Sequence, residues 1–275
     1  MVEILENTMI VPNLHLVTLV APQIASVVQP GQFVILRVEE DGERIPLTVS
    51  DWDQKNGTIS LVYLNVGKTS QKLAGKASGT SLPTAAGPLG NPMPIDYYGS
   101  VLCIGGCYGI ASVYPIARGL KSSGNRVTII MEARSAYLLY WQEKLKKVAD
   151  RLIVITRDGS RGLRGHIGNL AKIIDDLPAP VDRIIINGCN YLMMRGAQES
   201  LPLNIPTIVS LNTLMIDGTG MCGVCRLTVN SSTKFACVDG PHFNGHEVNW
   251  KELAQRRKAY LDEEVQSFRS SAAEE

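Results

Sequence analysis

The chain has 275 residues, of which 45% are hydrophobic and 19% charged, and its net charge at pH 7 is +1. This composition is typical of a globular protein with a sizeable core, and the length suggests about two domains. The small net charge offers no basic field for nucleic acid, and no apolar run approaches the roughly 18 residues of a membrane span. The acidic start, Met1 to Glu6, lacks the apolar segment of a signal peptide, and six cysteines are few for a disulfide scaffold. We therefore expect a protein of the reducing cytoplasm.

Residues 1–97 alternate short strand-like runs with turn signals. The runs include Leu14–Val20, Phe33–Val38 and Ile59–Leu64, and Asn56-Gly57 is one of the turns. Short strands at regular spacing predict a small antiparallel β-barrel.

Residues 98–209 carry longer buried-type runs that alternate with helical patterns. The helical patterns cover Ala111–Ser122 and Ala136–Val148. The apolar runs are Val101–Ile104, Val127–Met131, Leu152–Ile155 and Arg183–Ile186. This alternation predicts a parallel sheet with crossover helices, an α/β domain. Residues 210–275 form a third, smaller module, in which apolar residues from Trp250 onward predict a terminal helix.

The third module contains a cluster of thiols with the spacing C-x2-C-x11-C, formed by Cys222, Cys225 and Cys237. Thiolates are soft ligands that favour zinc or iron–sulfur iron over hard cations. With His242 the set becomes C-x2-C-x11-C-x4-H, which is a plausible zinc site. The spacing alone leaves both metals open.

Two glycine turns follow buried strands of the second domain. Gly105-Gly106-Cys107-Tyr108-Gly109 precedes a helix, and Gly188-Cys189-Asn190 follows the last long strand. The first is not a G-x-G-x-x-G fingerprint. Both turns are expected at the carboxyl ends of parallel strands, where open α/β sheets bind ligands and helix N-termini favour phosphate.

The barrel domain carries two further candidate segments. Gly67-Lys68-Thr69-Ser70 begins a predicted helix, but Val62 stands where a P-loop requires glycine. Arg44-Ile45-Pro46-Leu47-Thr48 begins a strand, and its guanidinium and hydroxyl could bind a pyrophosphate and a ring nitrogen. The alternatives are a capped surface helix with a solvated lysine and an edge strand with an exposed arginine.

Together with Gly87-Pro88-Leu89-Gly90-Asn91 and the segment from Ser210 to Gly223, these motifs resemble the ferredoxin–NADP reductase superfamily. Within it, the chain resembles the electron-transfer subunits of dihydroorotate dehydrogenase. It resembles even more the small subunits of NADH-dependent ferredoxin:NADP oxidoreductase, also called sulfide dehydrogenase. The resemblance covers nearly the whole chain.

The resemblance implies FAD on the barrel, NAD(P) on the second domain and one [2Fe–2S] cluster in the third module. The implied cluster ligands are Cys222, Cys225, Cys237 and Asp217, although Asp217 could instead be a turn residue that caps its loop. The implied function is electron transfer between NAD(P)H, FAD and the cluster, to or from a larger flavin and iron–sulfur subunit in a heterodimer. Ferredoxin would be reached through that subunit, and the resemblance leaves bifurcation open. There are two alternatives: an electron-transfer subunit of dihydroorotate dehydrogenase, and a zinc-stabilised nucleotide-binding module.

The resemblance also assigns individual residues. Thr48 would bind the flavin, Arg44 and the helix start Gly67–Ser70 the FAD phosphates, and Tyr63 or Leu64 would line the flavin beside Pro46 and Leu47. The nucleotide site would comprise Gly106, Gly109, Ile110, Glu132, Arg134, Asp158 and Gly188, with Cys189 near the nicotinamide.

Two positions depart from the family pattern. Most flavin reductases of this superfamily have arginine three residues before the hydroxyl residue, where this chain has Ile45, and Arg44 comes one position earlier. Arg157 stands where relatives often carry a second aspartate, and it could attract a 2′-phosphate or be a solvated surface charge. NAD and NADP both remain open.

Overall fold

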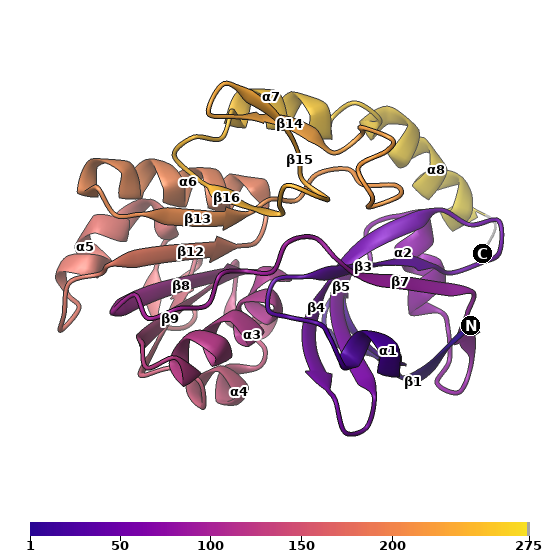
Figure 1. Cartoon of the computed structure of the whole chain (residues 1–275), viewed down its shortest axis with the longest axis horizontal. Helices are drawn as coiled ribbons and strands as arrows, with labels where there is room; N and C mark the ends of the chain where they lie inside the picture. Colours follow the sequence, from indigo (N-terminus) through magenta and orange to yellow (C-terminus); the bar gives the residue numbers. More distant parts are fainter. Residues whose placement is uncertain (274–275) are drawn as a thin grey trace.

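The computed structural model describes residues 1–273, with side-chain environments for residues 1–267. A barrel and an α/β domain lie side by side, and the C-terminal module packs across both (Figure 1). Both domain types agree with the prediction. The division of the chain at residues 97 and 209 stays a prediction.

The barrel is an antiparallel sheet in the order β6-β1-β2-β5-β4-β3-β7. Its strands are β1 (Val2–Val11), β2 (Leu14–Val20), β3 (Phe33–Arg37), β4 (Arg44–Asp53), β5 (Thr58–Leu64), β6 (Ser81–Leu82) and β7 (Thr84–Leu89). Helices α1 (Pro22–Ala25) and α2 (Lys68–Ala74) lie in the connections. Inward-facing residues such as Val17, Leu19 and Leu61 are fully buried, as the alternation of strand side chains requires.

The second sheet has the order β11-β10-β9-β8-β12-β13-β16. Its parallel strands are β8 (Ser100–Gly106), β9 (Arg126–Ala133), β10 (Arg151–Thr156), β11 (Leu163–Arg164), β12 (Arg183–Asn187) and β13 (Thr207–Ser210). Helices α3 (Gly109–Ser122), α5 (Leu170–Asp175) and α6 (Asn190–Ser200) connect them. Strand β16 (His242–Asn244) comes from the third module and pairs antiparallel with β13. This pairing attaches the module to the α/β domain.

The predicted helix over 136–148 is interrupted. A 3₁₀ turn covers Ala136–Leu138, and α4 begins only at Gln142 and ends at Lys146. Between them, Trp141 has a left-handed φ of 55°. The interruption lets Tyr140 enter the core, where its hydroxyl donates to Cys107 O at 2.9 Å and accepts from Ala111 N at 3.1 Å. A tertiary contact with the glycine turn therefore overrides the local helical pattern.

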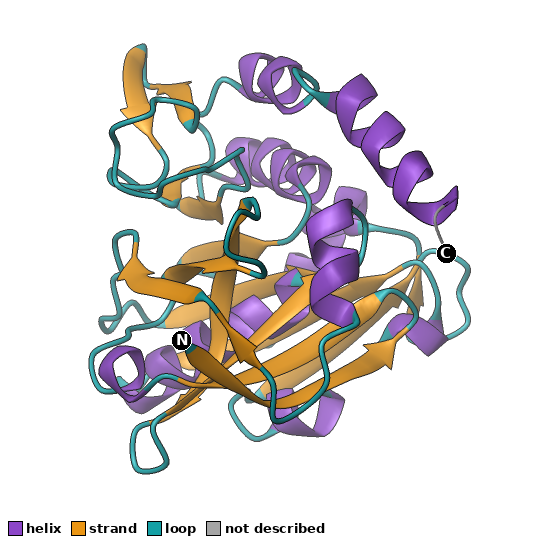
Figure 2. Ribbon diagram, turned by 90° about the vertical axis from the view of Figure 1, so that its right-hand side faces the viewer, coloured by secondary structure: helices purple, strands orange, loops and turns teal. Residues whose placement is uncertain are grey.

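The third module contains the hairpin β14 (Arg226–Val229) and β15 (Ser232–Phe235), followed by two helices where one was expected. These are α7 (Trp250–Arg257) and α8 (Leu261–Ala273), which the views show as separate rods (Figures 1 and 2). Leu253 of α7 is buried, and α8 lies against α2 of the barrel. The described helices include none with both the length and the apolar content needed to span a bilayer.

A hydrophobic core traced through the described residues joins all three segments. It contains Ile35 of the barrel, Ile104 and Ile186 of the parallel sheet, and Cys225 and Cys237 of the module. Because such a core is close-packed, it holds the module in place against both domains.

Candidate cofactor and cluster sites

Strand β4 places three of the four predicted flavin-site residues on one face and the fourth, Leu47, on the other. Arg44, Pro46 and Thr48 alternate with Ile45 and Leu47, which pack toward the barrel core. Arg44 is exposed, and Thr48 is half-buried. The one-residue displacement of the arginine therefore puts its guanidinium on the same face as the threonine hydroxyl, and Ile45 on the opposite one.

The Gly67–Ser70 turn begins α2, but most of its side chains are already engaged. Ser70 Oγ accepts from Gly67 N at 2.9 Å and Val66 N at 3.0 Å. Thr69 is buried, and its hydroxyl donates to Glu43 Oε2 at 2.7 Å. Lys68 is exposed. Lys68 and the first-turn amides are thus the groups of this turn that could meet a phosphate.

Of the two residues proposed to line the flavin, Tyr63 does not face a ligand surface. Its side chain is 2% exposed within the barrel core, and its hydroxyl donates to Asn7 Oδ1 at 3.1 Å. Burial raises the pKa of Tyr63. Leu64 is half-buried against the core between barrel and sheet, and it is the one that stays a candidate.

The predicted nucleotide residues meet at the carboxyl edge of the parallel sheet. Gly106 is paired with Glu132 across β8 and β9, and Gly105 with Asn187 across β8 and β12. The start of α3 lies so close to β12 that a Cβ on Gly109 would overlap the carbonyl oxygen of Asn187. Ile110 is buried behind this turn, and Cys189 is exposed at the adjacent one. Both glycine turns thus lie at the carboxyl ends of parallel strands, as predicted, and the two strands are neighbours.

Glu132, which was predicted to line the nucleotide site, is already engaged in contacts within the protein. The side chain is 4% exposed, accepts from Ile167 N at 3.0 Å and pairs with Arg157 at 3.3 Å. Arg157 is therefore not a free surface charge. Arg134 and Asp158 are exposed, and hydrogen bonds from Ser160 lower the pKa of Asp158 to about 2.

A hydrogen-bond chain that the sequence did not reveal links the two glycine turns to the third module. Tyr108 donates to Gly188 O at 2.8 Å and accepts from Asn212 Nδ2 at 2.8 Å. Asn190 Nδ2 donates to Asn212 O at 3.0 Å. The sequence signal that could have indicated this contact is a side chain able to hydrogen-bond in each glycine turn, Tyr108 in one and Asn190 in the other. These hydrogen bonds fix the start of the cysteine loop to the carboxyl edge of the parallel sheet.

The four predicted cluster ligands lie as two pairs. Cys222 Sγ is 3.2 Å from Asp217 Oδ1, and Cys225 Sγ is 3.2 Å from Cys237 Sγ. In the first pair Cys222 is exposed and Asp217 half-buried, and both members of the second pair are buried. Burial, together with the neighbouring Cys225 thiol, raises the pKa of Cys237 to about 12, so that a bound metal must displace its proton.

This arrangement fits two irons better than one ion. A [2Fe–2S] cluster takes two protein ligands on each iron, so its donors form two pairs. A single zinc requires its donors around one point. Among the described residues, no three His, Cys, Asp or Glu side chains gather closely enough to hold one ion. Asp217 also accepts from the amides of Thr219 and Cys222, so its turn-capping role and its position beside Cys222 coexist.

His242 is turned away from the thiols, which corrects the alternative zinc set. Its Nδ1 shares a 2.8 Å hydrogen bond with Ser210 Oγ, which donates to Asn187 Oδ1 at 2.7 Å. The Nε2 side packs against the backbone of Gly31 in the barrel. His242 thus lies at the junction of barrel, sheet and module.

We expect His242 to make folding stability fall with acid. Burial lowers the pKa of His242 from 6.5 to about 4, so the folded protein binds this proton less readily than the unfolded chain. The stabilisation is complete above pH 6.5 and is lost as the pH falls toward about 4, a change of about 3 kcal/mol. Denaturant unfolding of His242→Asn should show a shallower slope over this range. Exposed His166→Asn should keep the wild-type slope, and an equal slope in His242→Asn would contradict the assignment.

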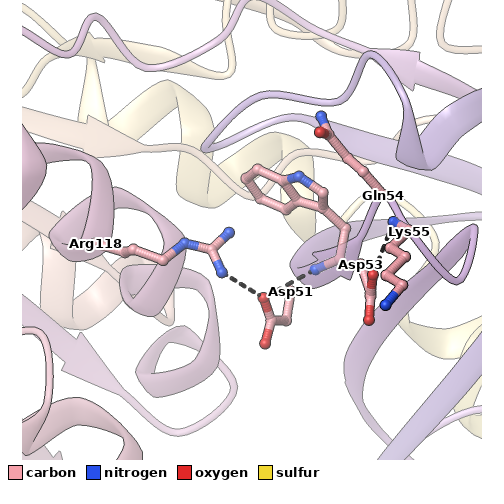
Figure 3. Close-up of a pocket in the computed structure, with 6 residues that line it drawn as sticks. Asp51, Asp53, Gln54, Lys55 and Arg118 are labelled. Atoms are coloured by element: carbon pink, nitrogen blue, oxygen red, sulfur yellow. Dashed lines mark hydrogen bonds and ion pairs between the residues drawn. The ribbon is translucent and has the colours of Figure 1, made fainter.

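A separate surface hollow lies where the barrel meets α3 (Figure 3). Arg118 binds Asp51 at 2.9 Å, and Lys144 binds the other carboxylate oxygen at 2.6 Å. The Arg118 guanidinium also stacks on Trp52, 4.6 Å from the ring centre. None of the predicted site residues lines this hollow. Its charges hold the two domains together.

Known proteins match both the third module and the whole chain. Residues 212–249 match the iron–sulfur cluster binding domain of dihydroorotate dehydrogenase B. The chain is 41% identical over 249 residues to the Thermotoga maritima dihydroorotate dehydrogenase B (NAD(+)) electron transfer subunit homolog, covering 90% of this chain and 87% of that protein. It is 31% identical to the Bacillus caldolyticus electron transfer subunit, covering 80% and 86%.

The structure resembles a chain of the NADH-dependent reduced ferredoxin-NADP oxidoreductase, solved to study flavin-based electron bifurcation. The TM-score is 0.92 at 39% identity, over 98% of this chain and 97% of that one. A Neisseria gonorrhoeae ferredoxin NADP+ reductase with bound FAD and NADP shares the fold over 74% of this chain and 90% of its own length, with a TM-score of 0.60 at 19% identity. The chain therefore belongs to the family of dihydroorotate dehydrogenase B electron-transfer subunits and their homologues.

Proposed function

We propose that this chain is an electron-transfer subunit that passes electrons between NAD(P)H, FAD and a [2Fe–2S] cluster, to or from a larger flavin and iron–sulfur subunit. The observation that carries the proposal is the pairing of Asp217–Cys222 and Cys225–Cys237 in a loop that rests on the barrel. A Cβ on Gly218 would lie 2.8 Å from Leu89 of β7. Flavin and cluster would therefore lie on adjoining surfaces, as electron transfer between them requires.

In this proposal the chain binds and orients its cofactors. When bound, the flavin and nicotinamide supply hydride transfer, and the cluster supplies one-electron transfer. Arg44 and the first turn of α2 would hold the FAD phosphates, while Thr48 would bind the flavin ring. The barrel residues Pro46 and Leu64 would supply apolar contacts, whereas Leu47 packs toward the barrel core.

The carboxyl edge of the parallel sheet would hold the nicotinamide nucleotide. Gly106, Gly109 and Gly188 allow backbone amides to approach its phosphates, and Cys189 would lie near the nicotinamide. Because Arg157 is paired with Glu132, its charge is partly neutralised, and Asp158 adds a negative charge nearby. These charges disfavour a 2′-phosphate, so we propose NADH as the preferred nucleotide.

The partner subunit would dock beside the cluster ligands. Met221 is 88% exposed next to Cys222, and Ile216 and Val238 are also exposed apolar residues that adjoin ligand positions. Exposed apolar residues gathered around a redox centre are suited to a protein interface. Ferredoxin would then exchange electrons through the larger subunit. All six cysteines lie in the described part of the chain, and none of them forms a disulfide bond, which suits the reducing cytoplasm.

The test is anaerobic titration of the chain co-produced with its companion subunit. We expect about two irons per chain, and NADH should bleach the flavin and then produce the paramagnetic signal of a reduced cluster. NADPH in a parallel titration tests the nucleotide preference. An iron-free complex, or one zinc per chain, would overturn the assignment.

Dihydroorotate-linked electron transfer is the second candidate, favoured by the 41% identical relative. Capturing the native companion with the full chain discriminates between the two. Reduction of the captured complex by dihydroorotate would support the second candidate. Reduction by NADH but not by dihydroorotate would support the first.

Asp217 provides a separate prediction about the ligand set. Asp217→Cys should keep the cluster but change its paramagnetic signal and lower its potential, because a thiolate donates more electron density than a carboxylate. Asp217→Asn should lose iron. Asp239→Asn is the matched control, since that carboxylate binds the Phe235 amide at 2.6 Å and is not part of either donor pair. Identical spectra in both Asp217 variants and the wild type would remove Asp217 from the ligand set.

A further inference from the structure

A small cavity lies between the cysteine loop and the turn that joins α7 to α8. Its volume is about 240 Å³. Its walls combine apolar side chains with an unusual number of positive charges. The lining residues are Thr213, Leu214, Val224, Leu253, Ala259, Tyr260 and three arginines, Arg226, Arg256 and Arg257.

Within residues 1–267, none of the three arginines has a counterion. No described carboxylate forms an ion pair with any of them. Arg226 donates to Gly223 O at 3.1 Å, and Arg256 donates to Val224 O at 3.3 Å. Each guanidinium carries five N–H donors, so these single bonds leave most of the donors available.

Thr213 adds an independent sign of a missing ligand. Its side chain is 5% exposed, and its hydroxyl oxygen has no hydrogen-bond partner among the described groups. Buried polar groups are normally paired, because leaving one unpaired costs its full desolvation. A hydroxyl in the wall of an arginine-lined cavity is suited to donate to an anion.

We propose that this cavity binds a small oxyanion of the phosphate class. Guanidinium groups bind phosphate through parallel N–H···O bonds, and the Thr213 hydroxyl would supply one further donor. The cavity is smaller than the pockets that hold drug-sized ligands, so it is suited to orthophosphate and not to a whole nucleotide.

The site adjoins the cluster ligands, which gives it a consequence that rests on the proposed function. Val224 lines the cavity and lies between Cys222 and Cys225. An anion here adds negative charge beside a centre that becomes more negative on reduction. Bound phosphate would therefore lower the cluster potential.

The test measures binding of inorganic phosphate to the full chain by calorimetry, at an ionic strength held constant with chloride. Arg257→Gln should weaken binding about tenfold or more, as expected for a hydrogen bond to a charged group. Thr213→Val removes the hydroxyl at similar size and should weaken binding severalfold. Thr213→Ser keeps the hydroxyl, and Lys251→Gln removes a charge from the same helix outside the cavity, so both should bind as the wild type does.

Several outcomes would overturn the site. These are an absence of saturable phosphate binding, unchanged binding in a folded Arg257→Gln variant, or competition by NADH, which would make the cavity part of the nucleotide site. If the wild type bound no phosphate and the Arg257→Gln variant no longer bound the companion subunit, the arginines would instead belong to the interface with that subunit. Phosphate binding is measurable whether or not iron is present, so its failure is distinct from failure of the electron-transfer proposal. In a loaded complex, an equal cluster potential in phosphate and chloride would refute the electrostatic consequence.

Discussion

Cys225→Ser should abolish the iron–sulfur cluster while leaving the flavin in place. The Cys225 side chain is 1% exposed, and its sulfur lies 3.2 Å from that of Cys237, so the substitution removes one donor of the buried pair. A serine hydroxyl is a harder and weaker donor than a thiolate. Iron and acid-labile sulfide should fall from about two per chain toward zero. Chemical analysis and paramagnetic resonance of the anaerobic complex measure the effect.

Cys103→Ser is the matched control for this experiment. Cys103 is buried within β8, where burial raises its pKa to about 12, and it belongs to a different core from the cysteine loop. Its serine variant should keep the iron content of the wild type, even if folding stability falls. Retention of the full cluster in Cys225→Ser would contradict the ligand assignment.

Gly109→Ala should destabilise the nucleotide domain by about 3 kcal/mol or more and weaken NADH binding. A methyl group at this position would overlap the carbonyl oxygen of Asn187. The contact is with backbone at the end of β12, so relief requires the two glycine turns to separate. Denaturant unfolding measures the loss, and nucleotide titration measures the change in the site.

Gly119→Ala tests whether the effect is specific to this contact. Gly119 lies in the same helix, and an added methyl would approach the Ile95 side chain at 3.3 Å. Because alanine favours helix over glycine by up to about 1 kcal/mol, this variant should be close to neutral. Similar destabilisation in both variants would show that the α3 helix, and not its approach to β12, is sensitive.

The hydrophobic patterns alone were sufficient to predict both domain types. Short strand-like runs such as Leu14–Val20 and Ile59–Leu64, separated by turn signals, predicted barrel strands, and β2 and β5 cover them. The run Val127–Met131, apolar apart from Thr128, predicted a buried strand of a parallel sheet, and β9 is buried on both faces. These predictions succeed because the order of apolar and polar residues within one strand reflects whether one or both of its faces are buried.

Three features that the local sequence does not reveal share a physical cause. The pattern over 136–148 is helical, but Tyr140 binds the glycine turn of a distant segment and breaks the helix. Tyr63 was assigned to the flavin surface, but its ring lies inside the barrel. His242 has the spacing of a zinc ligand, yet strand β16 carries it to Ser210 and Gly31. In each case a contact between residues far apart in the chain decided the outcome.

By itself, the sequence determined the barrel and the parallel sheet, because periodicity is a local property, and its C-x2-C-x11-C spacing marked Cys222, Cys225 and Cys237 as candidate metal ligands. Only the tertiary structure decided that Asp217 lies beside Cys222 and Cys225 beside Cys237, that Arg44 shares a face with Thr48, and that Thr213 and three arginines line one cavity. Which donors lie together, which side chains share a surface and which residues line a cavity all depend on how separate elements pack. That packing is a sum of many weak contacts between residues distant in the chain, and no single segment records it.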